Sequence, residues 1–549
     1  MHTTTYCIGI DTGGTYTDAV LMDTNTRQVL HQIKVRTTHN DLSIGVSEAL
    51  AQLLKNAIEP SSITRLAVST TLATNAIVEG RGAKVALFVL GTVRHFKLPI
   101  VANIFLKGGH TITGDEAQPL DMEELIDTLQ SIKNEVESYA VCGSMSIHNP
   151  THELVVEKAI SLIDPEKPVF SSHRISSHPG MHERSATACL HAKLQPLMVN
   201  FLASIQRSML ALDISCPVAI ICGNASGATL DETIEKAAIT MASGPAATAM
   251  FGAESTPREA IVVDVGGTTT DICLVRDSAP IMSDKGCQIG KWTTHVQAVD
   301  MYTAASGGDS HVNCDNRGRV SLHPYRVLPL AMTSDIPSPT TWLDTGKNSY
   351  LVLPANEEHS LPGDNPILAH LLANGPSTPT ELAEATSIQG IALEKRLEQM
   401  AYNQQVILTG FTPTDALHVF GELALGDKEM STAGAKILAE QCGLSLEMFC
   451  QTVLDTTKQA IENIILTYLV RKKWSKEQSA VLLGSNSNDF FSLSYSLHLP
   501  IIGIGAAARS FLPDIAKRLH TTVTFPEHYA VGNAIGAALI GLQQRSADK

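Results

Sequence analysis

Two hydrophobic periods alternate along the first 255 residues of the sequence. Short apolar and β-branched runs indicate strands, and apolar positions spaced three and four residues apart indicate helices. Strands that alternate with helices predict an α/β domain whose sheet is covered on both faces. The expected strands are 5–11, 18–23, 29–35, 65–70, 83–90, 138–145, 167–172 and 217–222, and the expected helices are 43–55, 150–162 and 183–212.

The same opening pattern begins again near residue 259. Runs at 260–267, 270–277 and 279–285 repeat the strand, turn, strand and strand of the N-terminus, which predicts a second domain of the same kind. Beyond residue 330, proline and serine become frequent, and the pattern is that of a small helical insert ending in a strand-like run at 404–411. The expected elements after the insert are helices at 431–441, 446–471 and 529–544 and strands at 479–484 and 500–505.

These changes of pattern divide the chain into two large domains and two smaller parts. A chain of 549 residues exceeds what one hydrophobic core usually organises, since domains cluster at roughly 100–200 residues. The first domain is predicted to cover 1–255, and the second to combine 256–330 with 413–527. An accessory insert, 331–412, interrupts the second domain, and a C-terminal helix covers 528–549.

Within the insert, residues 377–400 could form a winged-helix DNA-reading unit, with Thr378 at the cap of its first helix. A DNA reader needs basic side chains along its second helix. Only Lys395 and Arg396 stand there, and two glutamates oppose them. A structural insert is therefore the favoured interpretation.

Charge and hydropathy narrow the classes of partner. The 55 acidic residues outnumber the 40 basic ones, for a net charge of −15, and no block of about five or six like charges forms a basic surface. We therefore expect no nucleic-acid partner. Strand-like sequence begins by Tyr6, and no apolar run reaches the roughly 18 residues that span a bilayer, so we expect a cytoplasmic protein with no membrane segment.

Cysteines and histidines supply two further expectations. The ten cysteines include no Cys-x-x-Cys pair, and several lie in apolar runs, which predicts reduced and mostly buried thiols. His173, His178 and His182 are close enough in sequence to suggest a metal cluster. Pro179 and Gly180 break the segment, however, so that no single helix face holds all three, and a surface loop is favoured.

The most informative feature is a nine-residue turn that occurs twice. Residues 10–18 read IDTGGTYTD and residues 263–271 read VDVGGTTTD, with Asp264 placed 253 positions after Asp11. The shared residues are too many for chance in a chain of ordinary composition. The spacing also far exceeds the period of about 20–50 residues that solenoids repeat. The repeat therefore indicates two related domains, each with one such turn between two strands.

The residue types of the turn suit a phosphate chain and a cation. Paired glycines allow positive φ and let the backbone approach a bulky anion. Successive backbone N–H groups form an anion nest, to which the threonine hydroxyls add donors. Asp11 and Asp264, at the ends of their strands, would stand beside phosphate oxygens only with a hard cation between them, which fits Mg²⁺ held through water. The threonines are Thr15, Thr17, Thr268, Thr269 and Thr270.

The duplicated turns resemble the two phosphate loops of the actin-like ATPase superfamily, whose members bind ATP between two ribonuclease-H-like domains. Within it, the chain resembles the ATP-binding subunit of the hydantoinase/oxoprolinase family, in a short form. The resemblance implies an α/β fold with two ribonuclease-H-like domains around a nucleotide cleft and a small helical insert. The stretches that carry it are IGIDTGGTYTDAVLMD, STTLATNAIVEGRGAKVALFVLG, IHNPTHE, HERSATACLHAKLQP, SGPAATAMFGA, VVDVGGTTTDICLV, SGGDS, FTPTDALHVFG and PEHYAVGNAIGAAL.

The resemblance assigns roles to individual positions. Asp11 and Asp264 take the catalytic role of holding Mg²⁺ through water and orienting the attacking water. Asp18 and Asp271 either support them or bond to their own turns. GIGAAARSFLP matches the adenosine loop, where glycines let the backbone pass close to base and ribose. The residues expected to bind ATP are Gly13, Gly14, Thr15, Gly266, Gly267, Thr268, Thr269, Gly503 and Gly505.

Two helices rich in small residues, 243–253 and 529–539, match the hinge of the superfamily. Two features depart from the pattern. Chaperone relatives carry a glutamate before the proline of the first hinge helix, which helps to place the attacking water, and this chain has Gly244 there. Large family members also carry a further C-terminal domain after the adenosine loop, which this sequence does not include. Nucleotide binding is therefore a firmer expectation than unaided hydrolysis.

The activity that the resemblance implies is ATP-dependent hydrolysis of a cyclic amide such as a hydantoin or 5-oxoproline, commonly beside a second subunit. An unstrained lactam is a poor electrophile, and phosphorylation of its carbonyl oxygen supplies a good leaving group. No G-x-S-x-G elbow and no H-E-x-x-H motif is present, so amide cleavage needs a residue or partner that the sequence does not reveal. The oligomeric state stays open, a homo-oligomer included.

Two other functions fit the same fold. A small-molecule kinase needs a base beside the acceptor hydroxyl, for which Asp309 and Asp18 are candidates. A non-catalytic nucleotide switch would bind ATP tightly with negligible turnover. An iron–sulfur activase is disfavoured, because it needs clustered cysteines that this sequence lacks.

Overall fold

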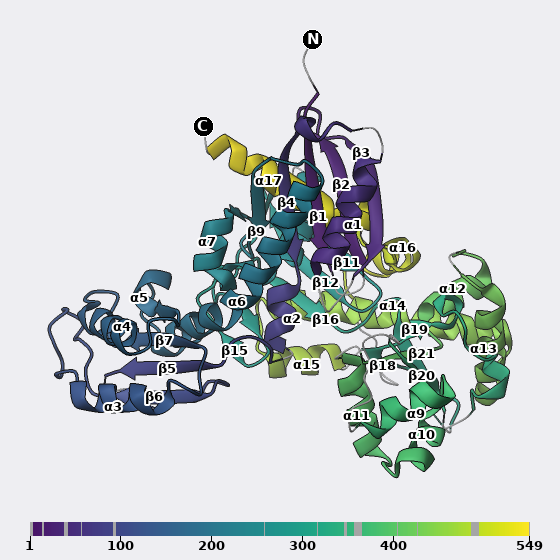
Figure 1. Ribbon diagram of the computed structural model, residues 1–549. Coiled ribbons are helices and arrows are strands. Elements are labelled where there is room, and N and C mark those ends of the chain that lie inside the picture. Colours follow the sequence, from purple (N-terminus) through teal and green to yellow (C-terminus); the bar gives the residue numbers. More distant parts are fainter. Residues whose placement is uncertain are drawn as a thin grey trace. The chain divides into compact units, whose positions relative to one another are not determined.

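The computed structural model of the chain is a mixed α/β fold (Figure 1) that divides into two compact units. Unit 1 comprises Met1–Arg258, Leu274–Asp300 and Val531–Lys549, and unit 2 comprises Glu259–Cys273 and Met301–Ala530. The described residues are 4–13, 16–37, 42–55, 58–78, 80–91, 95–256, 258–315, 317–344, 348–355, 365–402, 405–424, 426–484 and 494–547.

Unit 1 is built on a six-stranded sheet in the order β10-β9-β4-β1-β2-β3. β1 pairs antiparallel with β2, and β2 with β3, whereas β4 runs parallel to β1 and β9 runs parallel to β4. These elements confirm the strands predicted in the first 70 residues and at 217–222. They are β1 Tyr6–Thr12, β2 Tyr16–Asp23, β3 Val29–Arg36, β4 Ile63–Thr70, β9 Val218–Ile221 and β10 Gly227–Ala228.

Helices cover both faces of this sheet. Ile8 and Ile10 of β1 share a core with Leu50 of α1. Gly9 points to the other face, since successive strand residues alternate, and a Cβ there would lie 2.8 Å from the Cβ of Ala538 in α17. Burial on two sides explains why β1 reads as a continuous apolar run. The helices of this part are α1 Leu42–Leu54, α2 Leu72–Val78, α6 Met181–Ala211, α7 Leu230–Glu235, α8 Ser243–Glu254 and α17 Gly532–Ala547.

Glycine determines how closely α17 packs against its neighbours. A Cβ at Gly536 would lie 1.8 Å from the carbonyl oxygen of Ala247 in α8, and a Cβ at Gly9 would lie 2.1 Å from that of Ala534. No other residue fits at either position without moving the backbone. The close approach predicted for the two small-residue helices is therefore confirmed.

A separate four-stranded parallel sheet, in the order β6-β5-β7-β8, lies elsewhere in unit 1 (blue in Figure 1). Its residues alternate between two cores, because Leu87 faces α6 and Phe88 faces α3 and α4. The strands predicted at 83–90, 138–145 and 167–172 are confirmed, but they form this second sheet and do not join the first. The elements are β5 Val85–Leu90, β6 Ala102–Leu106, β7 Ser138–Gly143, β8 Val169–Ser171, α3 Met122–Ile132, α4 Thr151–Ile163 and α5 Ser172–Ile175.

The sheet of unit 2 repeats the order of the first. Strands β16, β12, β11, β22 and β23 occupy the places of β3, β2, β1, β4 and β9, with the same directions in the pairs β12–β16, β11–β22 and β22–β23. The strand predicted at 279–285 is reduced to the short β13, Ala279–Pro280, and β16 takes the third place. The strands are β11 Ala260–Val265, β12 Thr270–Arg276, β16 Met301–Ala304, β22 Ile501–Ile504 and β23 Val523–Thr524.

The predicted insert contains strands as well as helices. Helices α9 to α11 pack on a three-stranded sheet, in the order β19-β21-β20, around a core that includes Leu382, Leu397 and Val406. None of the described helices is both long and apolar enough to cross a membrane. The remaining elements of unit 2 are β17 Ser310–Cys314, β18 Val320–Arg326, β19 Leu328–Pro329, β20 Tyr350–Pro354, β21 Val406–Gly410, α9 Pro366–Asn374, α10 Pro379–Thr386, α11 Ile391–Tyr402, α12 Pro413–Phe420, α13 Lys428–Cys442, α14 Leu446–Val470, α15 Lys476–Gly484 and α16 Ala508–Arg518.

The strand predicted at 479–484 is wrong, since these residues end helix α15. A short apolar run does not by itself distinguish a strand from a helix. The deciding signal is Ser475, whose N–H donates to Gln478 Oε1 at 3.1 Å while Gln478 N donates to Ser475 Oγ at 3.3 Å. Such a reciprocal S-x-x-Q capping box starts a helix.

Gly536→Ala is expected to destabilise the protein, because its Cβ would press on the backbone of α8. Overpacking of this kind typically costs about 1–3 kcal/mol. Urea unfolding of variant and wild type measures the loss. Gly434→Ala in α13 is the matched control, since its Cβ would meet side-chain atoms and no backbone: its one close contact is a terminal methyl of Leu330, which can rotate away, and the ring of Phe411 lies at an ordinary 3.4 Å. Equal losses in the two variants would contradict the packing assigned to Gly536.

Candidate functional site

The first Gly-Gly turn joins β1 to β2 and is closed by one backbone hydrogen bond. Gly13 N donates to Tyr16 O at 3.1 Å, and Thr37 Oγ1 donates to Gly13 O at 3.0 Å. The predicted ligand residues Gly14 and Thr15 lie outside the described residues. The contact from Thr37, just after β3, fixes the carbonyl with which the turn begins.

The second turn, between β11 and β12, repeats this bond. Gly266 N donates to Thr269 O at 3.0 Å, and these two positions follow Gly13 and Tyr16 by the same 253 residues. The repeat in the sequence is therefore also a repeat in backbone geometry. Thr268 is exposed at the tip of this turn.

The SGGDS segment braces the second turn. Gly308 N donates to Gly266 O at 3.1 Å, and Asp309 N donates to Gly267 O at 2.7 Å. A Cβ at Gly267 would lie 2.3 Å from Asp309 Oδ2, so glycine is required there. Arg326 holds the Asp309 carboxylate in turn, with Nη2 at 3.0 Å from Oδ2. An ion pair outside the turn thus fixes the carboxylate that packs against Gly267.

Asp11 stands near the end of β1 and is buried, at 5% exposure. Ser69 Oγ donates to its Oδ1 at 2.5 Å, and Asn533 Nδ2 donates to its Oδ2 at 3.3 Å. Burial raises the pKa of Asp11 to about 6, although both hydrogen bonds act in the opposite direction. Among the described residues Asp11 has no ion pair, so its carboxyl is buried beside neutral donors.

Two helices hold the amide of Asn533 against Asp11. Thr248 Oγ1 in α8 donates to Asn533 Oδ1 in α17 at 2.5 Å, which directs the Nδ2 donor toward the carboxyl. Gly244 is also adjacent, since a Cβ there would lie 3.5 Å from Asp11 Oδ1. This position therefore adjoins Asp11 but has no side chain.

Two buried hydroxyls next to the turns lack hydrogen-bond partners within the described part of the chain. They are Thr12 Oγ1, directly after Asp11, and Ser306 Oγ, at the start of the SGGDS segment. Buried polar groups nearly always have a partner, so an unsatisfied one in a native site needs an explanation. A ligand or water bound at each turn would supply it.

In unit 2, the predicted adenosine loop lies beside the predicted metal-binding carboxylate. Gly505 follows β22 with φ +89°, and a Cβ there would lie 2.3 Å from Asp264 Oδ1. Gly505 is therefore required for the backbone to pass Asp264. At Gly503, glycine is needed for a different reason, which is packing: a Cβ there would lie 2.4 Å from the ring of Phe525.

Asp18 and Asp271 occupy equivalent positions but have different partners. Lys34 Nζ lies 2.6 Å from Asp18 Oδ1, whereas the hydroxyls of Thr303 and Thr269 donate to Asp271. Burial raises the pKa of both carboxyls. The Thr269 contact is a bond within the second turn, which is one of the two roles expected for Asp271.

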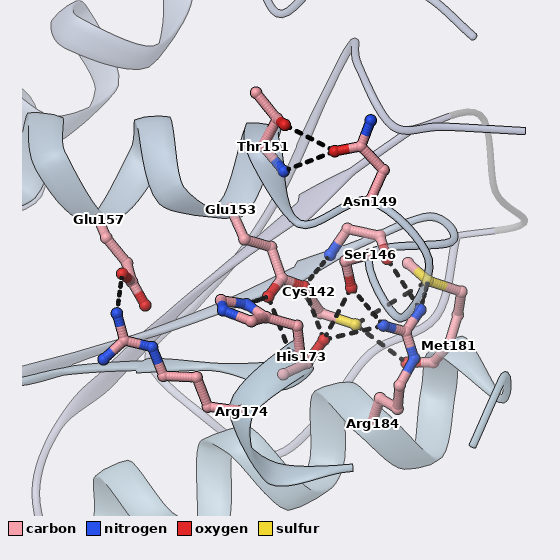
Figure 2. A network of polar contacts seen from close by, with 12 residues as sticks. Cys142, Ser146, Asn149, Thr151, Glu153, Glu157, His173, Arg174, Met181 and Arg184 are labelled. Atoms are coloured by element: carbon pink, nitrogen blue, oxygen red, sulfur yellow. Dashed lines mark hydrogen bonds and ion pairs between the residues drawn. The ribbon is translucent and has the colours of Figure 1, made fainter. Parts of the chain in front are cut away.

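Figure 2 shows a buried polar network at the carboxyl ends of β7 and β8. Arg184 is fully buried and donates to Ser146 Oγ at 2.5 Å and to Gly143 O at 2.8 Å. His173 Nδ1 lies 2.6 Å from the fully buried Glu153. Burial acts to raise the pKa of Glu153, but hydrogen bonds, that from His173 the largest, leave it below its usual value.

This network joins two of the family stretches, IHNPTHE and HERSATACLHAKLQP, which supply Glu153 and Arg184. Sequence reasoning missed it, because nothing in the spacing shows that the stretches meet. The three histidines considered as a metal cluster have different neighbours. His173 bonds to Glu153, whereas His182 packs edge-on against Phe96 and His178 lies near His295. No group of three or more metal-binding side chains occurs among the described residues.

All ten cysteines are free thiols, and eight of them are buried, which confirms that expectation.

Comparison with known proteins identifies the family. The model of the hydantoinase/oxoprolinase N-terminal region matches residues 7–163, and that of hydantoinase/oxoprolinase matches residues 184–340. The chain belongs to the hydantoinase/oxoprolinase family. This confirms the resemblance drawn from the repeated turns, since both turns lie within the matched regions of this family.

Curated relatives cover part of the chain. The caprolactamase subunit alpha of Pseudomonas jessenii is 26% identical over 363 residues, which are 58% of this chain and 50% of that protein. The acetophenone carboxylase gamma subunit of Aromatoleum aromaticum is 28% identical over 362 residues, 58% of this chain and 49% of that protein. The chain thus spans about half the length of the curated relatives it matches.

Two solved structures share the fold over most of the chain. Nucleotide-free acetone carboxylase has a TM-score of 0.65 at 16% identity, covering 97% of this chain and 70% of its own. The ATP-dependent caprolactamase from Pseudomonas jessenii has a TM-score of 0.64 at 20% identity, with the same coverage of 97% and 70%. At these identities the likeness shows the fold alone.

Asp11→Asn is expected to change the pH dependence of stability. The folded pKa of about 6 exceeds the ordinary 3.8, so stability from this carboxyl is full below about pH 4 and is lost as the pH rises through 6. An amide has no such dependence. Relative to wild type, the variant should therefore gain about 2 kcal/mol of unfolding free energy as the pH rises from about 4.5 to about 7.5. Urea unfolding in the presence of EDTA at both pH values measures this gain.

Asp23→Asn serves as the control for that comparison. Backbone N–H groups of Thr26 and Asn25 lower the pKa of Asp23 from the ordinary 3.8, so this carboxyl is ionised in both the folded and the unfolded state above about pH 4.5, and the variant should keep a nearly constant difference from wild type over that range. If the Asp11 and Asp23 variants changed in the same direction, the account of Asp11 would be wrong.

Proposed function

We propose that this protein binds Mg-ATP through its two Gly-Gly turns and uses it to hydrolyse a cyclic amide of the hydantoin or 5-oxoproline type, as one subunit of a complex. The observation that carries the proposal is the duplicated turn. The same hydrogen bond closes it at the same place in two sheets of the same strand order. That repetition supports two ribonuclease-H-like domains of the actin-like kind, which engage one nucleotide together.

The donors of the turns suit a triphosphate. Backbone N–H groups and hydroxyls would contact the phosphates, while the glycine-lined loop after β22 would pass beside the adenosine. Glycine is already required at Gly267 and Gly505 by close contacts. The proposed ATP-binding residues are Gly13, Gly14, Thr15, Gly266, Gly267, Thr268, Thr269, Gly503 and Gly505.

Asp11 and Asp264 fit the proposed role of holding Mg²⁺ through water. Asp11 is buried among neutral donors and its pKa is raised, so a nearby divalent cation would favour its ionised form. When bound, the metal would neutralise charge on the phosphoryl group. Ser69 and Asn533 would fix the direction of the Asp11 oxygens, and Asp11 would orient the attacking group by accepting its hydrogen bond.

The relatives support a cyclic amide as substrate. One is a caprolactamase subunit, and one structure of similar fold is an ATP-dependent caprolactamase. Phosphorylation of a lactam carbonyl oxygen would turn a poor electrophile into one with a good leaving group. Both curated relatives are named as subunits, so we expect that ring opening requires a partner chain.

ATP-dependent carboxylation of a ketone is the second candidate, favoured by the similarity to an acetophenone carboxylase subunit. The kinase alternative is less favoured. Its candidate bases are occupied, since Asp18 is paired with Lys34 and Asp309 with Arg326. A non-catalytic switch would show ATP binding without turnover.

Asp264→Asn is expected to lower ATP turnover by about 10–100-fold, the usual effect of losing a group that orients a metal-bound water. The fold should persist, because the amide has nearly the same size. Phosphate release and circular dichroism measure the two effects. Asp284→Asn, at an exposed position, is the matched control and should retain wild-type turnover.

Product analysis separates the candidate reactions. The chain, with the second subunit supplied, is incubated with Mg-ATP and hydantoin, 5-oxoproline or caprolactam. Inorganic phosphate with a ring-opened acid is the predicted result. A stable phosphoester would indicate the kinase instead, a carboxylated product from a ketone with bicarbonate would indicate the carboxylase, and binding without any turnover would indicate the switch.

A further inference from the structure

Two cysteines that are distant in sequence meet in unit 2. The sulfurs of Cys314 and Cys442, which are 128 positions apart, lie 3.0 Å from each other. Within the described part of the chain, no other pair of cysteine sulfurs is in hydrogen-bond contact. A sulfur–sulfur bond is about 2.05 Å long, so the two thiols need to move only about 1 Å to reach it.

The backbones around both cysteines are fixed by other contacts. Cys314 ends strand β17 and pairs with Val320 across the hairpin to β18. Gly318, in the turn of this hairpin, has φ +71° and packs on Cys442, since its Cβ would lie 3.1 Å from the Cys442 carbonyl oxygen. The approach of the thiols therefore follows from how the hairpin rests on the last turn of α13.

The C-cap of α13 fixes the position of Cys442. It is the last residue of α13, and Gly443 closes the helix in the left-handed conformation, with its N–H donating to the carbonyls of Ala439 and Glu440. An αL glycine of this kind is a common helix C-cap. Neither cysteine needs a rearrangement of secondary structure to approach the other.

We propose that Cys314 and Cys442 form a reversible disulfide, with a peroxide as oxidant. In the first step, the Cys442 thiol gives up its proton and its thiolate attacks one oxygen of hydrogen peroxide; the O–O bond breaks with formation of a sulfenic acid, and the departing hydroxide takes up a proton and leaves as one water. In the second step, the Cys314 sulfur attacks the sulfenic sulfur, the S–O bond breaks, and the hydroxyl takes the proton of the Cys314 thiol and leaves as a second water. Two thiols and one peroxide thus give one disulfide and two waters, and a dithiol reductant reverses the change.

Exposure sets the order of the two steps. Cys442 is partly exposed and can meet a peroxide, whereas Cys314 is buried, at 8% exposure. Burial, with the neighbouring Cys442, raises the pKa of Cys314, which keeps its thiol protonated and unreactive toward the oxidant. Cys314 is therefore the resolving residue.

The cross-link would act close to the second Gly-Gly turn, but the proposal does not depend on the proposed function. Strand β17 begins at Ser310, directly after Asp309, whose N–H holds the Gly267 carbonyl. A disulfide at the far end of β17 would fix this strand to α13 and restrict the unfolded chain. Oxidised protein should accordingly unfold at a higher temperature than reduced protein.

Mass spectrometry of the full chain after hydrogen peroxide treatment tests the proposal. The expected result is loss of two hydrogens, a fall in free thiols from ten to eight, and one cross-linked peptide that contains Cys314 and Cys442. Dithiothreitol should reverse all three changes and lower the melting temperature to that of untreated protein.

Variants identify the residues responsible. Cys442→Ser and Cys314→Ser should each abolish the cross-link, whereas Cys216→Ser, at the other partly exposed cysteine, should leave it unchanged. If Cys314→Ser does not fold, Cys442→Ser and peptide mapping of wild type still decide the matter. Three outcomes of peroxide treatment would overturn the proposal: ten thiols remain, Cys442 is oxidised only to sulfinic acid, or other cysteines are cross-linked.

Discussion

The site in unit 1 is built around a carboxyl that is buried beside neutral donors. Asp11 receives hydrogen bonds from Ser69 on β4 and Asn533 on α17, and burial still raises its pKa to about 6. A neutral amide at this position would raise the free energy of unfolding at neutral pH. The carboxyl therefore lowers stability there, and the fold does not require it. Residues of this kind are typical of functional sites, where perturbed pKa values gather.

The close packing of α17 brings Asn533 to this carboxyl. α17 can lie close to β1 only because Gly9 has no side chain, and close to α8 only because Gly536 has none. Thr248 on α8 then turns the amide toward Asp11. Unit 2 meets a similar requirement differently, since Gly505 passes Asp264 with positive φ and the SGGDS segment braces the turn. The repeat therefore preserves the turn while the contacts that support it differ.

Features that have a local sequence pattern could be predicted from the sequence. Contacts between residues far apart in the sequence could not. The repeated turn, the flanking strands and the small-residue helices were all visible, because each has a local pattern. The separation of β5 to β8 into their own sheet was not, since strand periodicity does not name a partner. The Arg184 network and the pair Cys314–Cys442 were missed for the same reason: each joins side chains through tertiary packing. The roles assigned to Gly13, Asp264 and the other site residues stay predictions.

The central claim is that two turns of one repeated design bind one triphosphate. A crystal structure with Mg²⁺ and a non-hydrolysable ATP analogue tests it most directly. The account predicts phosphate oxygens in contact with the backbone of both turns, around Gly13 and Gly266, with Mg²⁺ linked through water to Asp11 and Asp264. A nucleotide bound to one turn only, or bound elsewhere on the chain, would contradict it.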